Sequence, residues 1–212
     1  MMELQGKIID LSRRIKGIGK LWAIFGIGLS STIYVFSEKP VTVIDTGVGD
    51  MLNSLSRRFK NIDLRLSDVD IVILTHGHFD HIGGVMEIIE ETSPYIFIHR
   101  GDSSSLRGLT INELNGGELI QSAQPLKVIH TPGHTGGSIC LLIEDRGILF
   151  SGDTVFYGGF YGRTDLTGGS RVDMVNSLRR LSELRVECLL PGHGQLVFEN
   201  ADKHISRGTR ES

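Results

Sequence analysis

The chain has 212 residues, and its 22 basic and 25 acidic side chains give a formal net charge of −3. With 40% hydrophobic and 22% charged residues, the composition excludes a disordered chain, which needs low hydrophobicity and a high net charge. No Lys/Arg block stands out, and this argues against a nucleic-acid partner bound through a basic field. The length predicts a single domain over residues 1–212.

The apolar segment 21–29 (LWAIFGIGL) follows several basic residues and superficially resembles a secretory signal. It is too short to span a membrane, and β-type runs follow it directly. We therefore interpret 21–27 as a strand and expect a cytoplasmic protein with no membrane partner, while a signal peptide is the alternative. The two cysteines, Cys140 and Cys188, suit a reduced compartment, although one bridge between them stays open.

Short β-branched runs punctuated by glycine predict strands at 21–27, 32–36, 41–44, 70–74, 95–99, 127–130, 139–143, 148–150 and 187–190. Apolar residues at helical spacing predict helices over 50–59, 84–91 and 171–184, and the tail 199–212 reads as a short helix that frays. Strands interleaved with helices indicate the α/β class. Because several strands follow one another without a helix between them, two mixed sheets flanked by helices fit better than one parallel sheet.

The predicted strand 70–74 runs into a loop that carries His76, His78, Asp80 and His81. Imidazole and carboxylate ligands in this proportion suit Zn²⁺, Mn²⁺ or Fe²⁺. In an extended loop, the side chains of 76, 78 and 80 point one way and that of 81 points the other, so the cluster could serve two neighbouring metals. A surface loop that happens to be rich in histidine is the alternative interpretation.

Three further apolar runs end in small-residue loops, each with one ligand-type side chain: His134, Asp153 and His193. Glycine beside each of them allows the backbone to approach a crowded centre closely. A lone Gly-His pair is more often a simple turn. Four such segments, each at the exit of a predicted strand, together indicate a shared metal site.

The segments THGHFDH (75–81), TPGHT (131–135), SGDT (151–154) and PGHG (191–194) resemble, in this order, the signature of the metallo-β-lactamase superfamily. The resemblance implies an α/β fold, a four-layer αββα sandwich of two mixed β-sheets flanked by helices, with a binuclear metal site at one edge. It implies one metal on His76, His78 and His134, a second on Asp80, His81 and His193, and Asp153 bridging them. Asp45 matches a position that orients a ligand imidazole.

The implied cofactors are two divalent metal ions, zinc first, with iron or manganese as alternatives. A hydroxide shared by two such ions can attack an electrophilic carbonyl or phosphorus at neutral pH, and Asp80 and Asp153 would act as its catalytic carboxylates. No dedicated general acid stands out in the sequence. This favours an activated small-molecule substrate, such as a thioester, whose leaving group needs little protonation.

The stretch GDTVFYGGFYGRTD (152–165) is similar to the glyoxalase II-like branch, and persulfide dioxygenases share a similar stretch. By this resemblance, Arg163 would contact an anionic substrate and Tyr161, with Tyr157, would line the same mouth. An Arg163–Asp165 pair that stiffens the loop is an equal alternative. Only 19 residues follow His193, whereas glyoxalase II proper has a C-terminal helical domain that grips glutathione. We therefore expect a glyoxalase II-like hydrolase whose thiol carrier stays open.

The main alternative is a persulfide dioxygenase with a single iron held by His76 or His78 together with His134 and Asp153. A lactonase, a phosphodiesterase or nuclease, and a metal-binding module without catalysis are less favoured. Of the remaining histidines, His99 and His204 have no ligand context, and we expect structural or exposed roles for them. His130 lies at a predicted strand end, where we expect a packed core histidine, and support of a metal ligand is the alternative.

Overall fold

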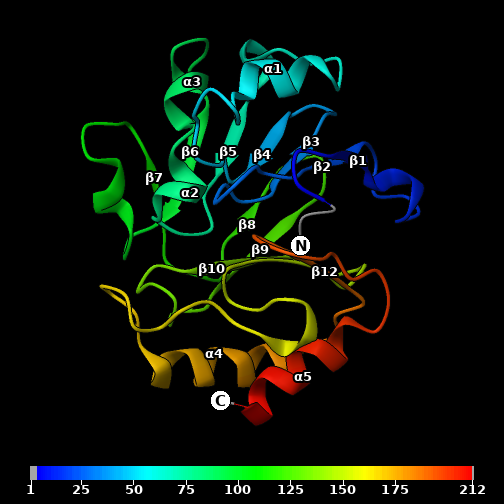
Figure 1. Cartoon of the computed structure of the whole chain (residues 1–212), viewed down its shortest axis with the longest axis vertical. Coiled ribbons are helices and arrows are strands. Elements are labelled where there is room, and N and C mark those ends of the chain that lie inside the picture. The colour runs from blue at the N-terminus through cyan, green and yellow to red at the C-terminus, as the bar shows by residue number, and fades with distance from the viewer. Residues whose placement is uncertain (1–3, 212) are drawn as a thin grey trace.

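The computed structural model describes residues 4–211. Two β-sheets pack face to face, with helices on the outer face of each (Figure 1). Seven strands form the first sheet in the order β1-β2-β3-β4-β5-β6-β7, and five form the second in the order β12-β11-β10-β9-β8. The predicted αββα sandwich of two mixed sheets is confirmed.

The first sheet is antiparallel through its first four strands and parallel from β4 to β7. The second is antiparallel except for the parallel pair β11–β12. The bounds are β1 (Ile8–Asp10), β2 (Leu21–Ile24), β3 (Ile33–Phe36), β4 (Thr42–Ile44), β5 (Ile71–Ile73), β6 (Tyr95–His99), β7 (Asn112–Leu114), β8 (Leu119–Ile120), β9 (Leu126–His130), β10 (Ile139–Ile143), β11 (Ile148–Gly152) and β12 (Cys188–Pro191).

All predicted strands overlap observed ones, but the prediction missed β1, β7 and β8. Each of these three lies at an edge of its sheet. An edge strand is paired on one side only and is short and partly solvated, so its sequence carries a weak hydrophobic pattern. The residues of β7, for example, are exposed except for Leu114.

The helices are α1 (Leu55–Lys60), α2 (Phe79–Ile82), α3 (Val85–Ile89), α4 (Arg171–Ser182) and α5 (Ala201–Glu211). Helices α1 and α3 cover the first sheet, and α4 and α5 cover the second (Figure 1). None of the helices within residues 4–211 has the length and apolar character needed to cross a bilayer.

The helix predicted over 50–59 begins only at Leu55. The Asp50 carboxylate accepts hydrogen bonds from the backbone N–H groups of Leu52 and Asn53, at 3.0 and 2.8 Å, and so forms a side-chain turn in place of the first helical turn. Met51 and Leu52 are consequently solvent-exposed rather than buried on a helical face.

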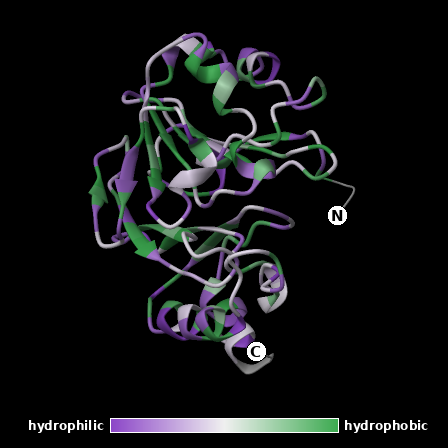
Figure 2. Ribbon diagram, turned by 90° about the vertical axis from the view of Figure 1, so that its left-hand side faces the viewer, coloured by the Kyte–Doolittle hydropathy of each residue, from purple (hydrophilic) through white to green (hydrophobic). Residues whose placement is uncertain are grey.

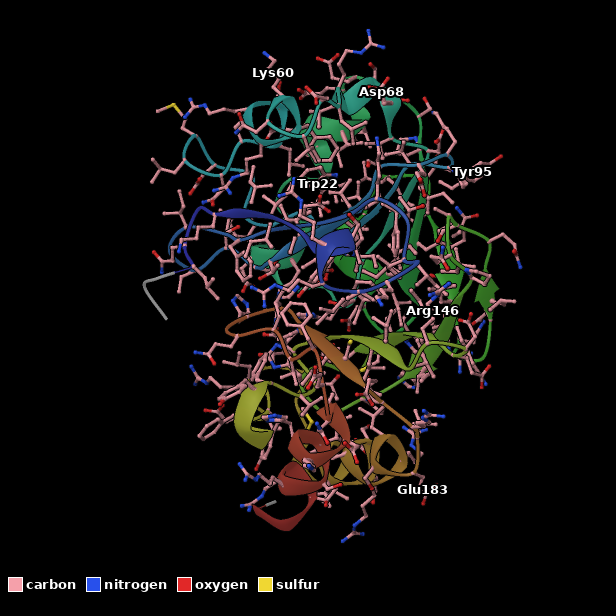
Figure 3. All side chains as sticks on the ribbon, turned by 90° about the vertical axis from the view of Figure 1, so that its right-hand side faces the viewer. Trp22, Lys60, Asp68, Tyr95, Arg146 and Glu183 are labelled. Atoms are coloured by element: carbon pink, nitrogen blue, oxygen red, sulfur yellow. The ribbon has the colours of Figure 1, made fainter. Side chains whose placement is uncertain are left out.

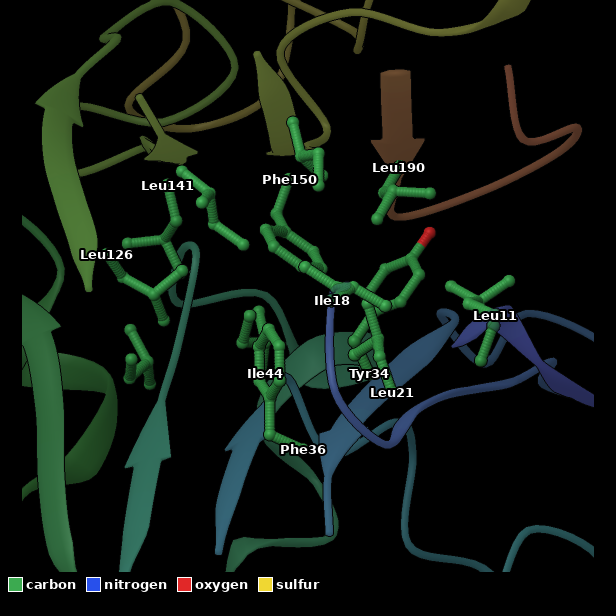
Figure 4. Close-up of a cluster of buried hydrophobic side chains, with 14 of the residues drawn as sticks. Leu11, Ile18, Leu21, Tyr34, Phe36, Ile44, Leu126, Leu141, Phe150 and Leu190 are labelled. Atoms are coloured by element: carbon green, nitrogen blue, oxygen red, sulfur yellow. The ribbon is translucent and has the colours of Figure 1, made fainter. Parts of the chain in front are cut away.

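The main core lies between the two sheets, whose strands are rich in hydrophobic residues (Figure 2) and whose apolar side chains meet there (Figure 4). Tyr34 and Phe36 from the first sheet meet Phe150 of the second edge-on, with ring centroids 5.1 and 5.9 Å apart. The Tyr34 hydroxyl donates to the carbonyl of Pro191 at 2.7 Å. Charged side chains such as Lys60, Asp68 and Glu183 lie at the two outer ends of the sandwich (Figure 3).

The core fixes both sheets so that the loops with the predicted ligands share one edge. β4 and β5 run parallel in the first sheet, and β9, β11 and β12 run in one direction in the second, because β9 and β11 are both antiparallel to β10. The backbone N–H of Ile139 donates to the carbonyl of Thr75 at 2.8 Å, which joins the sheets at this edge.

Both cysteines are free and buried, so the alternative of a disulfide bond between them is wrong. Burial raises the pKa of Cys140 and of Cys188 to about 11. Since the thiolate is the reactive form, we expect both thiols to react very slowly with a disulfide reagent at pH 8 in the native protein and to react fully in denaturant. Rapid stoichiometric labelling of the native protein would contradict this packing.

Candidate metal centre

The structure brings all seven predicted ligands together at the shared edge. His76, His78, Asp80 and His81 follow β5, while His134, Asp153 and His193 follow β9, β11 and β12. Their ligand-type atoms form three overlapping groups, within each of which all atoms lie within 4.8 Å of one another: His76, His78 and His134; His76, His81 and Asp153; and Asp80, His81 and His193. The first and third groups coincide with the two metal positions implied by the sequence.

Within the first group, His78 Nδ1 lies 2.8 Å from His134 Nε2. Within the third, His193 Nε2 lies 3.1 Å from Asp80 Oδ2 and 3.3 Å from His81 Nε2. Such short separations between atoms that would all be ligands indicate a crowded centre in which each group faces a common point.

Asp153 lies between the two groups. Its Oδ1 is 3.3 Å from His81 Nε2. Its Oδ2 is 3.5 Å from His134 Nε2 and 3.7 Å from His193 Nε2. A carboxylate in this position can reach both groups at once.

The loop after β5 is not extended throughout, as the sequence analysis assumed. His78 has an extended backbone and occupies the N-cap position of helix α2, in which residues 79–82 form one helical turn. Asp80 and His81 are therefore separated from His76 and His78 by a change of backbone conformation and not by strand-like alternation, so that part of the prediction was wrong. The turn also packs closely at Gly77, because a Cβ there would collide with Ser105 Oγ and crowd Asp102 Cβ, so that the Ser105 side chain would have to shift.

A buried network built on Asp45 orients two imidazoles. Asp45 Oδ2 lies 2.8 Å from His81 Nδ1, and Asp45 also accepts from the Thr75 N–H at 2.8 Å and the Thr75 hydroxyl at 2.9 Å. A carboxylate only accepts, so His81 Nδ1 donates and its Nε2 faces the centre. Because the Thr75 hydroxyl donates its hydrogen to Asp45, its oxygen accepts a hydrogen bond from His76 Nδ1 at 3.1 Å.

Thr75 was not predicted, and neither was Asp102, which joins the two histidine-bearing loops. The buried Asp102 carboxylate accepts from the Gly77 N–H at 2.8 Å, the Thr135 hydroxyl at 2.6 Å and the Gly137 N–H at 2.9 Å. Nothing in its local sequence, an ordinary Gly-Asp-Ser turn, distinguishes Asp102 from a surface residue. Only the fold places it between loops that are more than thirty residues apart in sequence.

Burial and neighbouring charge set the protonation of the centre. Burial, reinforced by the neighbouring His81, lowers the pKa of His76 well below its ordinary value, and burial also lowers the pKa of His78. Burial alone would raise the pKa of Asp153, but His81, His76 and His193 together outweigh burial and hold that pKa below its usual range. Neutral imidazoles beside an ionised carboxylate are the forms that bind a cation.

His81 differs from its neighbours. Burial lowers its pKa, but Asp45 and Asp153 together outweigh burial and raise the pKa well above its ordinary value. The protonated ring faces Asp45 through Nδ1 and Asp153 through Nε2, so its single positive charge offsets part of two carboxylate charges, a task that a bound cation would take over.

The donor set fits a metal. Among the described residues, His76 Nε2 and Asp153 Oδ1 are buried side-chain atoms without a hydrogen-bond partner. Buried polar atoms in native proteins are nearly always paired, and both of these atoms face the centre within one candidate group. Five imidazoles and two carboxylates suit zinc, iron or manganese better than magnesium or calcium.

The predicted substrate contacts have other partners in the structure. The Arg163 guanidinium makes a bidentate pair with Asp165, at 2.9 and 2.8 Å, which is the loop-stiffening alternative. The backbone carbonyl of Arg163 accepts a hydrogen bond from His134 Nδ1 at 2.7 Å. Tyr161 packs against the core under the second sheet, while Tyr157 is 48% exposed and lies over His204. Contact of Arg163 or Tyr161 with a substrate stays a prediction.

The three remaining histidines lie outside the ligand groups. His99 and His130 stack with ring centroids 3.9 Å apart. His204, on α5, accepts from the Gly158 N–H at 2.8 Å and so fastens the loop that follows Asp153.

Known proteins resemble the chain over most of its length. The family model of the metallo-β-lactamase superfamily matches residues 26–193. A probable metallo-hydrolase of Methanocaldococcus jannaschii is 33% identical over 192 residues, which are 81% of this chain and 91% of that protein.

Two relatives have named activities. The hydroxyacylglutathione hydrolase GloC of Haemophilus influenzae is 29% identical over 78% of this chain and 85% of its own length. The human acyl-coenzyme A thioesterase MBLAC2 is 32% identical over 81% of this chain and 76% of its own length.

A solved structure, TTHA1623 in a di-iron-bound form, matches with a TM-score of 0.73 and 26% identity, over 88% of this chain and 98% of that one. The fold, the clustered His/Asp groups and the family match over residues 26–193 agree. The chain is thus a member of the metallo-β-lactamase superfamily, with candidate metal-binding groups at the edge of its sandwich.

Proposed function

We propose that the protein is a metal-dependent hydrolase of thioesters or similarly activated esters, with a small-molecule substrate. The observation that carries the proposal is the pair of ligand groups with Asp153 between them. The likeness to a hydroxyacylglutathione hydrolase and to an acyl-coenzyme A thioesterase supports the thioester class. A cytoplasmic location stays a prediction from the sequence.

In this proposal His76, His78 and His134 would hold one metal ion and Asp80, His81 and His193 would hold the second, and Asp153, which lies between the two groups, would be available to both. Zinc is the first choice, and iron or manganese are alternatives that the same donors accept; a di-iron form of a similar structure supports iron among them. Two bound divalent cations would lower the pKa of a shared water from about 15.7 towards 7 and so supply a nucleophile at neutral pH.

The protein's own groups favour a good leaving group. The pKa of Asp153 and that of Asp80, which burial alone would raise, both lie below their ordinary range because of the adjoining histidines. Neither carboxyl therefore holds a proton to donate at neutral pH. A thiolate, whose parent thiol has a pKa of about 8.5, leaves without such a donor more readily than an alkoxide or an amine does. Asp80, at the rim, can instead accept a hydrogen bond from the attacking water.

The hypothesis of a mononuclear iron persulfide dioxygenase uses only His76 or His78 with His134 and Asp153. The second group, Asp80 with His81 and His193, is complete, and this favours two metals over one. Lactonase, phosphodiesterase and nuclease activities have no observation in their favour beyond the shared fold.

The proposal is tested by metal analysis of the purified protein together with thiol release from a panel of thioesters. We expect two metal ions per chain and hydrolysis of at least one S-hydroxyacyl or S-acyl thioester. One iron per chain with oxygen consumption on a persulfide, and no thioester cleavage, would overturn the proposal.

Replacing Asp153 by Asn tests the shared carboxylate. An amide has one acceptor oxygen and no charge, so we expect Asp153→Asn to lose metal and to reduce thioester hydrolysis by several orders of magnitude. Circular dichroism and thermal unfolding measured beside the assay should show a native fold, because the ligand-bearing loops stay tied to the sheets. Near-normal rates would reject the role of Asp153 between the two metals.

Asp102→Asn tests whether the hydrogen bonds of this carboxylate hold the two histidine-bearing loops in place. The amide keeps the shape but removes an acceptor from Gly77 or Gly137, so we expect metal affinity to fall by about 10–100-fold, as for other residues that support ligands. Competition with a chelator measures this, and the exposed Asp145, replaced in Asp145→Asn, is the matched control. An unchanged affinity in Asp102→Asn would show that the loops hold their positions without this carboxylate.

A further inference from the structure

A pocket of about 380 Å³ adjoins the candidate metal centre on the side of His193. Three segments line it: the N-terminal segment 4–14, the β2–β3 loop and the loop that follows β12. A volume of this size is at the lower end of those that hold small ligands. Because His193 belongs to one of the ligand groups, a molecule bound at the metals could extend one arm into this pocket.

One part of the pocket wall is apolar, and the rest is polar. Four of the lining side chains, Leu4, Ile9, Leu196 and Phe198, pack against the core between the two sheets. Of the described residues that line the pocket, Arg14 alone carries a permanent charge. The pocket therefore combines an apolar side, uncharged polar side chains such as Gln5 and Gln195, and one fixed positive group.

Arg14 is held in place without being neutralised. Its guanidinium carbon lies 5.3 Å from the centre of the Phe198 ring, an arrangement in which the ring face attracts the cation. The nearby acid Asp10 is paired with Arg13, at 3.2 Å, and among the side chains that the structure describes, those of residues 4–209, no carboxylate lies within ion-pair distance of Arg14. Stacking on a ring leaves the edge N–H groups of a guanidinium available to a planar anion.

The pocket wall is also firmly attached. Asn53 clamps Ile27 of the β2–β3 loop through both backbone groups, at 2.8 and 3.2 Å, and Arg58 donates to the Phe25 carbonyl at 2.8 Å. The Thr32 N–H donates to the Gly192 carbonyl at 2.7 Å, which ties this loop to the segment that carries His193. The pocket is thus formed before a ligand arrives, which lowers the entropic cost of binding.

We propose that this pocket binds an apolar substrate arm that ends in a carboxylate, and that Arg14 is the residue that recognises the carboxylate. The proposal rests on the proposed function and makes it more specific, because it names the class of thioester preferred. The carboxylate can belong to the acyl part, as in a succinyl thioester, or to the thiol part, as in a thioester of 3-mercaptopropionate. The guanidinium fork matches either one.

The first test is binding, measured by calorimetry on the metal-loaded full chain with uncleavable thioether analogues. One analogue of each arm ends in a carboxylate and its matched partner ends in a primary amide. We expect the carboxylate to bind about tenfold more tightly than the amide, the usual scale for a hydrogen bond to a charged group. Arg14→Met should abolish this preference and Arg14→Lys should retain part of it, while Arg179→Met, a control at an exposed arginine of α4 outside the pocket, should leave it intact.

The second test is the ratio of kcat/KM for carboxylate-ended over amide-ended thioesters, which should fall about tenfold in Arg14→Met and stay constant in the control Arg179→Met. Equal binding of carboxylate and amide, or an equal effect of the two substitutions, would overturn the pocket assignment. If no thioester is cleaved while the Arg14-dependent binding preference persists, the proposed function fails and the anion pocket stands.

Discussion

Five imidazoles and two carboxylates converge at one edge of the sandwich, and this convergence is the constraint on which the rest of the structure depends. Asp153 is at its middle, within 3.3 to 3.7 Å of three of the imidazoles. So many polar groups can be buried together only if a cation or a shared proton compensates their charge. Nε2 of His76 and Oδ1 of Asp153 are buried without a hydrogen-bond partner. At these two atoms the protein's own groups do not satisfy the polar atoms of the centre.

The surrounding structure serves to hold these groups in fixed orientations. Asp45 and Thr75 fix the outward nitrogens of His81 and His76, and the Arg163 carbonyl fixes that of His134. With one ring nitrogen engaged, the other must face the centre. The parallel strands contribute because the loops that follow them meet at one edge of each sheet. The aromatic contacts of Tyr34 and Phe36 with Phe150 hold the two sheets together.

In the function that we propose, substrate selection is separated from this centre. The superfamily fold is shared by proteins of different activity, so specificity must come from groups outside the ligand set. In this chain the pocket beside His193 has an apolar wall and the cation of Arg14. On the other side, the guanidinium of Arg163 is already paired with Asp165. An unpaired cation over an apolar wall distinguishes ligands by charge, whereas a paired surface cation does so only weakly.

Local patterns in the sequence were sufficient for the central strands and for the four ligand-bearing segments. A buried strand needs a continuous apolar run, and a metal ligand needs a particular side chain at a strand exit, and both are visible in a few consecutive residues such as 71–81. The edge strands β1, β7 and β8 were not visible, because partly solvated strands need no such run. The helical turn 79–82 was also hidden, since a four-residue helix is too short to show a period.

The supporting contacts came from tertiary structure. Asp102 is important because folding brings Gly77 and Thr135 to its carboxylate, and Arg14 because folding places Phe198 beneath it. These contacts join residues far apart in the chain, whose separation is overcome by burial of the core between the sheets and not by any local preference. A short stretch of sequence can encode which atoms could bind a metal. The distances between those atoms, and whether each one is left without another partner, depend on packing across the whole sandwich.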